Sequence, residues 1–206
     1  MCGRQEADVA AAPLTVTSTR ARVVDFTTPF WVDRIVVIMS KRHATQFDIH
    51  SVADLARQSP IRYCALTSGA TKHFLQASTN IPFAGMWEEM AGDPTSWVHT
   101  VEEGLQRVVE CSDEHPWAFV TQISVLSSVN AHLRCDMEVI DLDVQRFLSM
   151  ALPIGSDYRD RLSLGILVML ESGELQKLRY KWWYDQSLDC DTSANGAAKR
   201  FLFSLH

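Results

Sequence analysis

Short apolar runs alternate with amphipathic and polar segments along this chain. Runs rich in β-branched and aromatic residues predict strands, and apolar residues at helical spacing predict helices. The predicted strands are RIVVIMSK (34–41), PIRYCAL (60–66), WAFVT (117–121) and MEVI (137–140). The predicted helices cover 51–58, 67–78 after a glycine turn, 100–110, 123–133, and two segments of 156–185 that break near Gly173.

The segments between these elements are polar or irregular. Residues 41–50 (KRHATQFDIH) indicate a polar connection, and residues 6–14 indicate a helix end or loop that leads into a short buried strand. The tail 191–206 has little pattern, and we expect it to be poorly ordered. Because strands and helices alternate, the chain is predicted to be an α/β protein with a largely parallel sheet.

Composition narrows the possible partners. The 206 residues suffice for one domain or two small lobes, and a net charge of −6 argues against nucleic acid, which needs a basic surface. The longest mainly apolar stretch, 162–170, is far shorter than the roughly twenty residues that cross a bilayer. The N-terminal residues show no signal-peptide pattern. We expect no membrane span within this chain, and composition alone leaves its compartment open.

Residues that could perform catalysis form no recognisable motif. The cysteines (2, 64, 111, 135 and 190) form no CxxC pair. The histidines form no HExxH zinc motif, and the chain contains no GxSxG nucleophile motif. Cys64 lies within a predicted strand, where a buried and unreactive thiol is the usual case. We therefore expect no enzymatic activity, no metal and no cofactor.

A polar patch between apolar runs, PLTVTSTR, is the first candidate for binding. The planar guanidinium of Arg20 matches a carboxylate, and the Pro13 carbonyl and Thr15 hydroxyl could accept hydrogen bonds from an ammonium group. Alternatively, Arg20 is a solvated surface residue and Thr15 an ordinary strand residue.

A second candidate is SGATKHF, a turn that opens a helix. Backbone N–H groups of Gly69, Ala70 and Thr71 would lack helical partners there, and the helix dipole would favour an anion. The alternative is that Ser68 only caps a surface helix. The spacing does not match a phosphate-binding P-loop.

Four blocks in this order resemble the ligand-binding domain of ionotropic glutamate receptors, nearest to the kainate and AMPA branch. They are ADVAAAPLTVTSTRARVVDFTTPF (7–30), SGATKHF (68–74), GMWEEM with the later VEEGLQRVVE (85–110), and PIGSDYRD through KWWYDQSLDC (153–190). The resemblance implies a bilobed clamshell of the periplasmic-binding-protein type (type II). Residues 1–32 and 148–190 would form an incomplete first lobe, 33–147 the second lobe, and 191–206 a tail. The family's pore segments would have their place between 41 and 50, where this chain has only the short connection.

The resemblance also implies residue roles. Arg20 would bind the α-carboxylate of an amino acid, Pro13 and Thr15 its ammonium, and Ala70 and Thr71 a side-chain carboxylate. Gln122 stands where the family has the acid that pairs with the ammonium, and Phe147 and Leu148 replace the family's glycine and tyrosine beside the pocket. A Cys135–Cys190 disulfide would match the family and an extracellular setting.

These implications give two hypotheses. The first is a module that binds a glutamate-like amino acid, here without its channel, in a receptor on the outer face of the plasma membrane. The alternative is a soluble receptor-like protein that has lost glutamate binding and acts through association with other receptor subunits.

Overall fold

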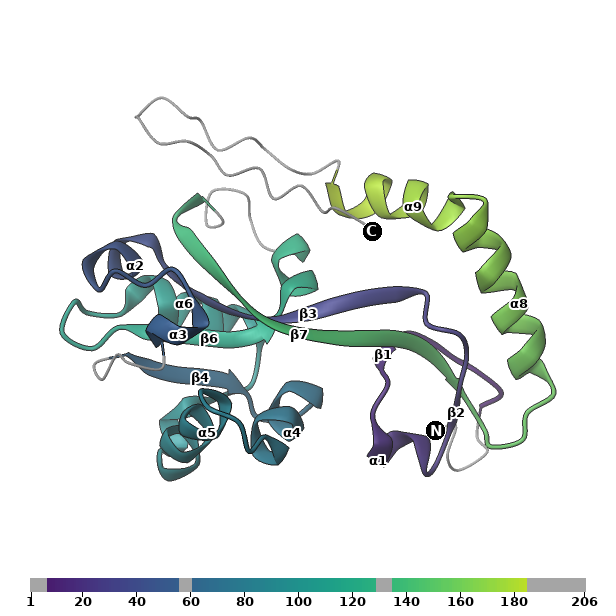
Figure 1. The fold of residues 1–206 in the computed structure, drawn as a ribbon, viewed down its shortest axis with the longest axis horizontal. Helices are drawn as coiled ribbons and strands as arrows, with labels where there is room; N and C mark the ends of the chain where they lie inside the picture. Colours follow the sequence, from purple (N-terminus) through teal and green to yellow (C-terminus); the bar gives the residue numbers. More distant parts are fainter. Residues whose placement is uncertain (1–6, 56–60, 129–134, 185–206) are drawn as a thin grey trace.

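The computed structural model describes residues 7–55, 61–128 and 135–184, and one mixed sheet organises them (Figure 1). The strand order is β1-β7-β3-β6-β4-β5, and β2 also pairs with β7. The strands are β1 (Ala10–Thr15), β2 (Asp25–Phe26), β3 (Trp31–Ser40), β4 (Arg62–Leu66), β5 (Trp97–Val98), β6 (Trp117–Gln122) and β7 (Met137–Leu152).

Helices gather at both ends of the long strands β3 and β7 (Figure 1). The α-helices are α1 (Ser18–Ala21), α2 (Lys41–Gln46), α3 (Val52–Leu55), α4 (Ala70–Ala77), α5 (Phe83–Gly92), α6 (Val101–Glu110), α8 (Tyr158–Glu171) and α9 (Glu174–Arg179). Short turns of other helix types are η2 (Pro94–Ser96), η3 (Ile123–Ser128) and η4 (Tyr180–Tyr184).

The continuous apolar run of β3 is explained by burial on both of its faces. Ile35, Val37 and Met39 pack into one core cluster, whose other members include residues of α4 and α5. Val36 and Ile38 face the opposite cluster, with Leu105 and Val108 of α6 among its members. Because side chains alternate along a strand, an apolar residue at every position is required for a strand covered on both sides.

The sheet is mostly antiparallel, so the prediction of a largely parallel sheet was wrong. Among the strands of the described residues, only the β4–β5 and β4–β6 pairs are parallel, whereas the pairs that β7 makes with β1, β2 and β3 and the β3–β6 pair are antiparallel. Strand direction depends on how the chain returns to the sheet, and the alternation of strands and helices does not determine it.

β7 is much longer than the predicted strand over 137–140, and it contains an irregularity in its middle. Ile35 of β3 pairs with Val144, but the next residue, Val36, pairs with Asp141. The two β7 residues between them form a bulge, and Asp143 there adopts a positive φ of 57°. The bulge divides the β3–β7 pair into two regular ladders.

The other predicted elements have mixed outcomes. The strands β3, β4 and β6 and the helices α4, α6, α8 and α9 are confirmed, including the break at Gly173, which has a left-handed φ of 74°. The predicted polar connection 41–50 was wrong, because residues 41–46 form α2 and bury His43 and Ala44. β1 is half-exposed rather than buried. The predicted helix over 123–133 is a 3₁₀ turn (η3) as far as residue 128.

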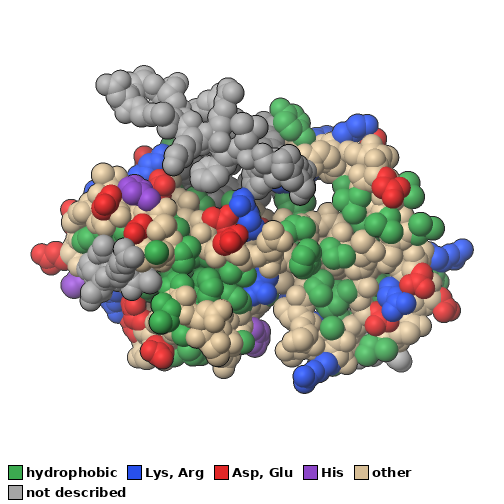
Figure 2. Space-filling view, in the orientation of Figure 1, with side chains coloured by type: hydrophobic (Ala, Val, Ile, Leu, Met, Phe, Trp, Pro, Cys, Tyr) green, Lys and Arg blue, Asp and Glu red, His purple; other side chains and the backbone are tan. Residues whose placement is uncertain are grey.

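The two ends of the β3–β7 pair differ in packing. We call the end with α2 to α6 and β4 to β6 the packed end, and the end with β1, α1, β2, α8 and α9 the open end (Figure 1). Of the fourteen residues of α8 only Ile166 is buried, whereas the side chains of Leu164 and Val168 are 64% and 55% exposed. In Figure 2 green apolar side chains accordingly show on the surface of the open end as well as the packed end.

The predicted lobe boundaries stay a prediction, but their position in the sheet is clear. The boundaries at 32/33 and 147/148 fall inside β3 and β7, where Val32 and Phe147 pair with each other. The tail 191–206, Cys190 and the ends of the helices predicted over 51–58 and 123–133 lie outside the described residues. No helix that the structure describes is long and apolar enough to cross a membrane.

Candidate functional site

Thr15 and Arg20 lie together at the junction of β1 and α1. The Thr17 side chain accepts a hydrogen bond from the Arg20 backbone N–H at 3.3 Å and caps this short helix. The turn brings the Arg20 guanidinium back to the end of β1, where Nη1 donates to the Thr15 carbonyl at 2.8 Å. One of the five guanidinium donors is thus used to fix the side chain, and a planar fork still suits a carboxylate.

Gln122, the last residue of β6, reaches the same place from a distant part of the sequence. Its Nε2 donates to Thr15 Oγ1 at 3.4 Å, although 107 residues separate the two in sequence. The sheet explains the meeting: Thr15 pairs with Leu148 on β7, Leu148 pairs with Trp31 on β3, and Gln122 pairs with Ile35 further along β3. The structure therefore brings Thr15, Arg20 and Gln122 into one hydrogen-bonded group.

Thr15 is the centre of this group, because its carbonyl accepts from Arg20 and its hydroxyl accepts from Gln122, and it is protected from water. Thr15 is 5% exposed, whereas Arg20 is only half-buried. A buried hydroxyl has two acceptor lone pairs and one donor. With the Gln122 amide on one lone pair, the oxygen can accept one further hydrogen bond and donate one.

Pro13 lies two residues before Thr15, at an irregular point of β1. The β1–β7 register shifts between Ala10 and Leu14, and Pro13 falls inside this shift. Proline has no N–H for the ladder, so an irregularity at this position is expected. Pro13 is exposed, and its place in β1 puts it next to the hydrogen-bonded group.

Ala70 and Thr71 are the first two residues of α4, as predicted. The residue before them, Gly69, has a φ of 117°, which glycine adopts at little cost. The N-cap residue is Gly69 and no side chain caps this end of α4, so the alternative in which Ser68 caps the helix is wrong. The first-turn N–H groups point out of the helix end, where an anion would be favoured.

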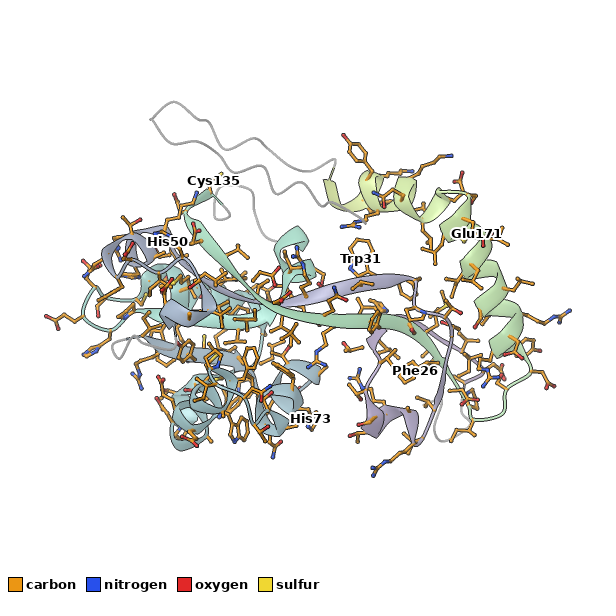
Figure 3. The ribbon with its side chains drawn as sticks, in the orientation of Figure 1. Phe26, Trp31, His50, His73, Cys135 and Glu171 are labelled. Carbon is orange, nitrogen blue, oxygen red and sulfur yellow. The ribbon has the colours of Figure 1, made fainter. Side chains whose placement is uncertain are left out.

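The start of α4 and the Arg20 group stand on opposite sides of a gap. Figure 3 labels His73 on α4 and Phe26 on β2 across this gap, and Figure 2 shows the surface notched between the two parts. Among the residues that the structure describes, no hydrogen bond or ion pair joins Ala70 or Thr71 to Arg20 or Thr15. The predicted site residues therefore form two groups rather than one.

Arg146 is a cation that sequence reasoning missed. Its guanidinium lies 4.4 Å from the centre of the Phe74 ring, so it connects β7 to α4. Its Nε is buried without a hydrogen-bond partner, and burial lowers the pKa of the group. In the sequence Arg146 follows the polar residues of β7 and precedes Phe147, and nothing local marks it as different from a surface arginine.

Asp33 supports the position of Gln122. This carboxylate is fully buried and accepts hydrogen bonds from the Ser124 hydroxyl at 2.6 Å, the Ser124 N–H at 3.2 Å and the Arg34 N–H at 2.9 Å. A buried charge is tolerated when its lone pairs are satisfied in this way. Asp33 thereby fixes the chain just after Gln122, where β6 ends and η3 begins.

The cysteines divide into two free thiols and one bonded residue among those described. Cys64 and Cys111 are free. Cys135 is disulfide-bonded, and its partner lies outside the described residues, so the pairing with Cys190 stays a prediction. Burial raises the pKa of the Cys64 thiol to about 12, which agrees with the expectation of an unreactive thiol.

The chain is similar to known proteins along most of its described length. Residues 2–43 match the family model described as "Ligated ion channel L-glutamate- and glycine-binding site". A glutamate receptor of Lymnaea stagnalis is 36% identical over 160 residues, which are 76% of this chain and 17% of that protein. A kainate-type ionotropic glutamate receptor of Caenorhabditis elegans is 33% identical over 156 residues, 75% of this chain and 18% of that protein.

Two further relatives agree with these. Glutamate receptor 3 of Mus musculus is 32% identical over 152 residues, which are 72% of this chain and 17% of the receptor. The solved structure of the Drosophila muscle GluRIIB complex with glutamate has a TM-score of 0.76 and 29% identity, covering 88% of this chain and 70% of that one. The chain thus spans less than a fifth of the curated relatives' length, and the resemblance found in its sequence is confirmed.

Proposed function

Since this chain is a relative of the ionotropic glutamate receptors and shares the fold of their ligand-binding domain, we propose that it is a module that binds a glutamate-like amino acid. The observation on which this rests is the hydrogen-bonded group of Arg20, Thr15 and Gln122. The cation, the buried hydroxyl and the amide of this group would suit one small zwitterion.

The proposed role of Arg20 is to bind the α-carboxylate. Its bond to the Thr15 carbonyl holds the guanidinium in one orientation before the ligand arrives, which lowers the entropy lost on binding. The Pro13 carbonyl and Thr15 Oγ1 would accept from the ammonium, and the Gln122 amide oxygen would take the place of a carboxylate. A neutral amide gives a hydrogen bond without the charge pairing.

The proposed partner of the ligand's side-chain carboxylate is the start of α4. The N–H groups of Ala70 and Thr71 and the Thr71 hydroxyl are suited to an anion. Because this group faces Arg20 across a gap, the ligand would have to connect the two sides. Binding would then favour the conformation in which they approach.

Isothermal titration with L-glutamate, glycine and other amino acids tests this proposal. Arg20→Ala is expected to weaken glutamate binding by about 2–5 kcal/mol, since it leaves the ligand carboxylate without its partner. Arg22→Ala is the matched control, because Arg22 is an exposed arginine on the same turn. Gln122→Glu is expected to strengthen binding about tenfold by restoring a charge-assisted bond. If no amino acid binds while circular dichroism shows the fold intact, the proposal is wrong.

A second candidate function is favoured by the exposed apolar side chains of α8. Under this alternative the chain has lost glutamate binding, as the neutral Gln122 suggests, and acts through association with other receptor subunits. Tyr158, Leu164 and Val168 expose more than half of their surface. Exposed apolar area of this kind drives association when a partner covers it.

Sedimentation velocity separates the two candidates. If α8 mediates association, the protein forms dimers at micromolar concentration that Leu164→Glu abolishes, whereas Glu171→Gln, a polar change at the end of the same helix, leaves them intact. A monomer that binds glutamate excludes the alternative.

The proposed setting is the outer face of a plasma membrane, as the relatives' identity as receptors and the disulfide at Cys135 suggest. The proposed partners are the amino-acid ligand and other subunits of a receptor. No catalytic role is proposed.

A further inference from the structure

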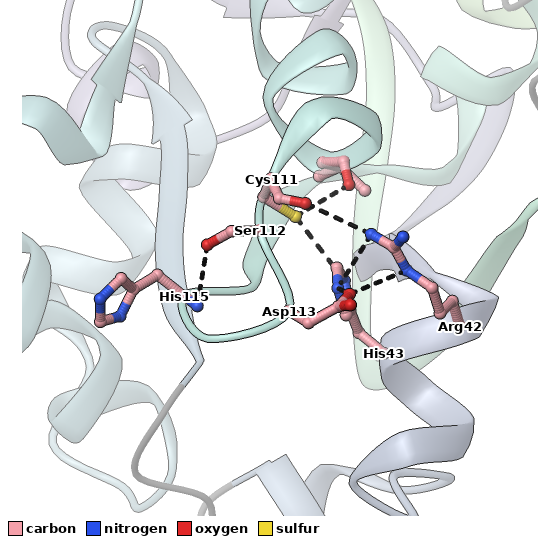
Figure 4. Close-up of polar contacts among 7 residues, drawn as sticks. Arg42, His43, Cys111, Ser112, Asp113 and His115 are labelled. Atoms are coloured by element: carbon pink, nitrogen blue, oxygen red, sulfur yellow. Dashed lines mark hydrogen bonds and ion pairs between the residues drawn. The ribbon is translucent and has the colours of Figure 1, made fainter.

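A cluster of titratable side chains at the packed end takes no part in the proposed amino-acid site. It joins α2 to the C-terminal end of α6 and the loop after it (Figure 4). Cys111 Sγ lies 3.6 Å from His43 Nδ1, and His43 Nε2 lies 3.1 Å from Asp113 Oδ1. A thiol, an imidazole and a carboxylate therefore stand in a row.

Arg42 holds this row together from the side. Its Nε pairs with Asp113 Oδ1 at 3.1 Å, and its Nη2 donates to the Cys111 carbonyl at 3.3 Å. These contacts fix the loop after α6 against α2. The imidazole itself is fully buried, whereas the side chain of Asp113 is 60% exposed.

The neighbours of His43 determine which of its ring nitrogens faces the thiol as an acceptor. Nε2 lies 3.1 Å from Asp113 Oδ1 and 3.3 Å from Arg42 Nη2. The carboxylate requires an N–H at Nε2, whereas the guanidinium, which has donors alone, would require a lone pair there, and the carboxylate contact is the shorter of the two. We therefore assign the proton to Nε2, which leaves the Nδ1 lone pair directed at Cys111.

This order of groups is that of a nucleophile, a base and the group that orients the base. A metal site would direct all three side chains at one point, whereas here the imidazole contacts its two neighbours through opposite nitrogens. In the resting thiol, Cys111 Sγ also lies 3.1 Å from the Val108 carbonyl. The thiol hydrogen thus has two acceptors, and only the imidazole can take it up as a proton.

Cys111 is half-buried and is one of the residues that line a hollow of about 340 Å³. Its walls are charged and aromatic, and they are formed by Glu103, Gln106, Arg107, Glu110, Cys111 and Trp117. The Arg107 guanidinium lies 5.0 Å from the centre of the Trp117 ring and pairs with Glu103 at 3.1 Å. Charges of both signs beside a thiol suit a zwitterionic peptide that has carboxylates and an ammonium.

We propose that Cys111 is a redox modification site, at which a low-molecular-weight peptide disulfide of the oxidised-glutathione type forms a mixed disulfide. The Cys111 thiol gives its proton to His43 Nδ1 as its sulfur attacks one sulfur of the disulfide. The new S–S bond forms as the old one breaks, and the departing thiolate takes the proton from His43. Asp113 is a positioning residue that keeps the imidazole in the accepting tautomer.

The test is the rate at which the folded protein reacts with oxidised glutathione, followed by intact mass and peptide mapping. Cys111 is expected to be modified about tenfold or more faster than the same cysteine in a synthetic peptide of residues 105–115, which contains Asp113 but not His43. Cys64, fully buried, is the internal control and is expected to react only after denaturation. Cys111→Ser is expected to remove the modification, and Cys64→Ser to leave it.

Variants of the base and its orienting group extend the test. His43→Gln is expected to lower the rate about tenfold, with circular dichroism as the check on folding of this buried substitution. Asp113→Asn, at an exposed position, is expected to lower it several-fold, and Asp113→Glu to restore most of it. Because the ion pair of Asp113 with Arg42 would respond to these variants in the same way, the rate is also measured as a function of pH: a changed role of His43 is expected to move the pH profile, whereas loss of the ion pair alone leaves its shape unchanged.

Reaction of Cys111 at the rate of the peptide overturns the proposal, and so does a rate unchanged by Asp113→Asn. The reaction needs no amino-acid ligand, so its outcome is independent of whether the chain binds glutamate.

Discussion

The packed end and the open end share the strands β3 and β7 but use their apolar side chains differently. At the packed end Leu75 and Met90 are fully buried between helices and sheet. At the open end, α8 also contains many apolar residues, but it leaves Leu164 64% exposed. Since burial of apolar area is the main stabilising contribution, the free energy of unfolding is expected to come chiefly from the packed end.

Polar contacts connect the start of α8 to the rest of the open end. Asp25 accepts a hydrogen bond from the Gly155 N–H at 2.9 Å and lies 3.7 Å from Arg159, while the Ser163 hydroxyl accepts from the Thr28 N–H at 3.1 Å. A net contribution of about 0.5–1.5 kcal/mol is usual for such a hydrogen bond, and less for an exposed ion pair. These contacts fix where α8 starts more than they stabilise it.

The largest effect is expected for Phe119→Ala at the packed end. Phe119 is fully buried, and its ring lies so close to Gly104 of α6 that a Cβ there would be 2.7 Å from it. Removing the ring leaves a cavity and is expected to lower the free energy of unfolding by about 3–5 kcal/mol. Urea denaturation measures it. A loss below about 1 kcal/mol would contradict the view that stability is located at this end.

A pair of substitutions on α8 tests the open end. Ile166→Ala is expected to cost about 2 kcal/mol, because Ile166 is the buried residue of this helix. Leu164→Ala, two residues earlier, is expected to change stability by no more than about 0.5 kcal/mol. Both are measured by urea denaturation at protein concentrations where the chain is monomeric. Equal losses would mean that α8 is covered on both sides.

The smallest effect is expected from acid titration at the edge of the packed end. Asp93 accepts hydrogen bonds from the Thr95 hydroxyl at 2.6 Å and its N–H at 2.8 Å, and these bonds, with Arg62 nearby, lower the pKa of the Asp93 carboxyl. A pKa lower in the folded than in the unfolded state stabilises the fold above about pH 4, and the contribution is lost as the pH falls through the folded value.

Asp93→Asn should therefore lower stability at neutral pH, and the difference from the unsubstituted protein should shrink on acidification. Unfolding curves recorded at several pH values between about 7 and 2 provide the measurement. A difference that stays constant over this range would show that the carboxylate charge plays no part.

How far the sequence predicted the fold depended on whether the deciding information was local. β3 and α6 were predicted because a continuous apolar run and a periodic one each have one usual structure. α2 was missed because KRHATQ has no apolar stripe, and its burial of His43 comes from α6 and the following loop. β7 was predicted too short because polar residues such as Gln145 and Arg146 interrupt its pattern where one face is exposed.

The candidate sites show the same limit. Thr15 and Arg20 are five residues apart, and their contact could be expected from the sequence of one turn. The contact of Gln122 with Thr15 depends on three strand pairings, and only the family resemblance indicated it before the structure. No sequence pattern indicated the row of Cys111, His43 and Asp113, because 68 residues separate the thiol from its base.

The bulge in β7 has a mechanical consequence for the two ends. A regular ladder resists twisting because each hydrogen bond restrains the next, and this restraint is interrupted where Val144 and Asp141 pair with neighbouring residues of β3. Torsion of one end against the other is expected to concentrate there, within two or three residues on each side. The long strands would then act as two stiff rods joined by a short compliant segment, whose stiffness depends on how readily Asp143 leaves its left-handed conformation.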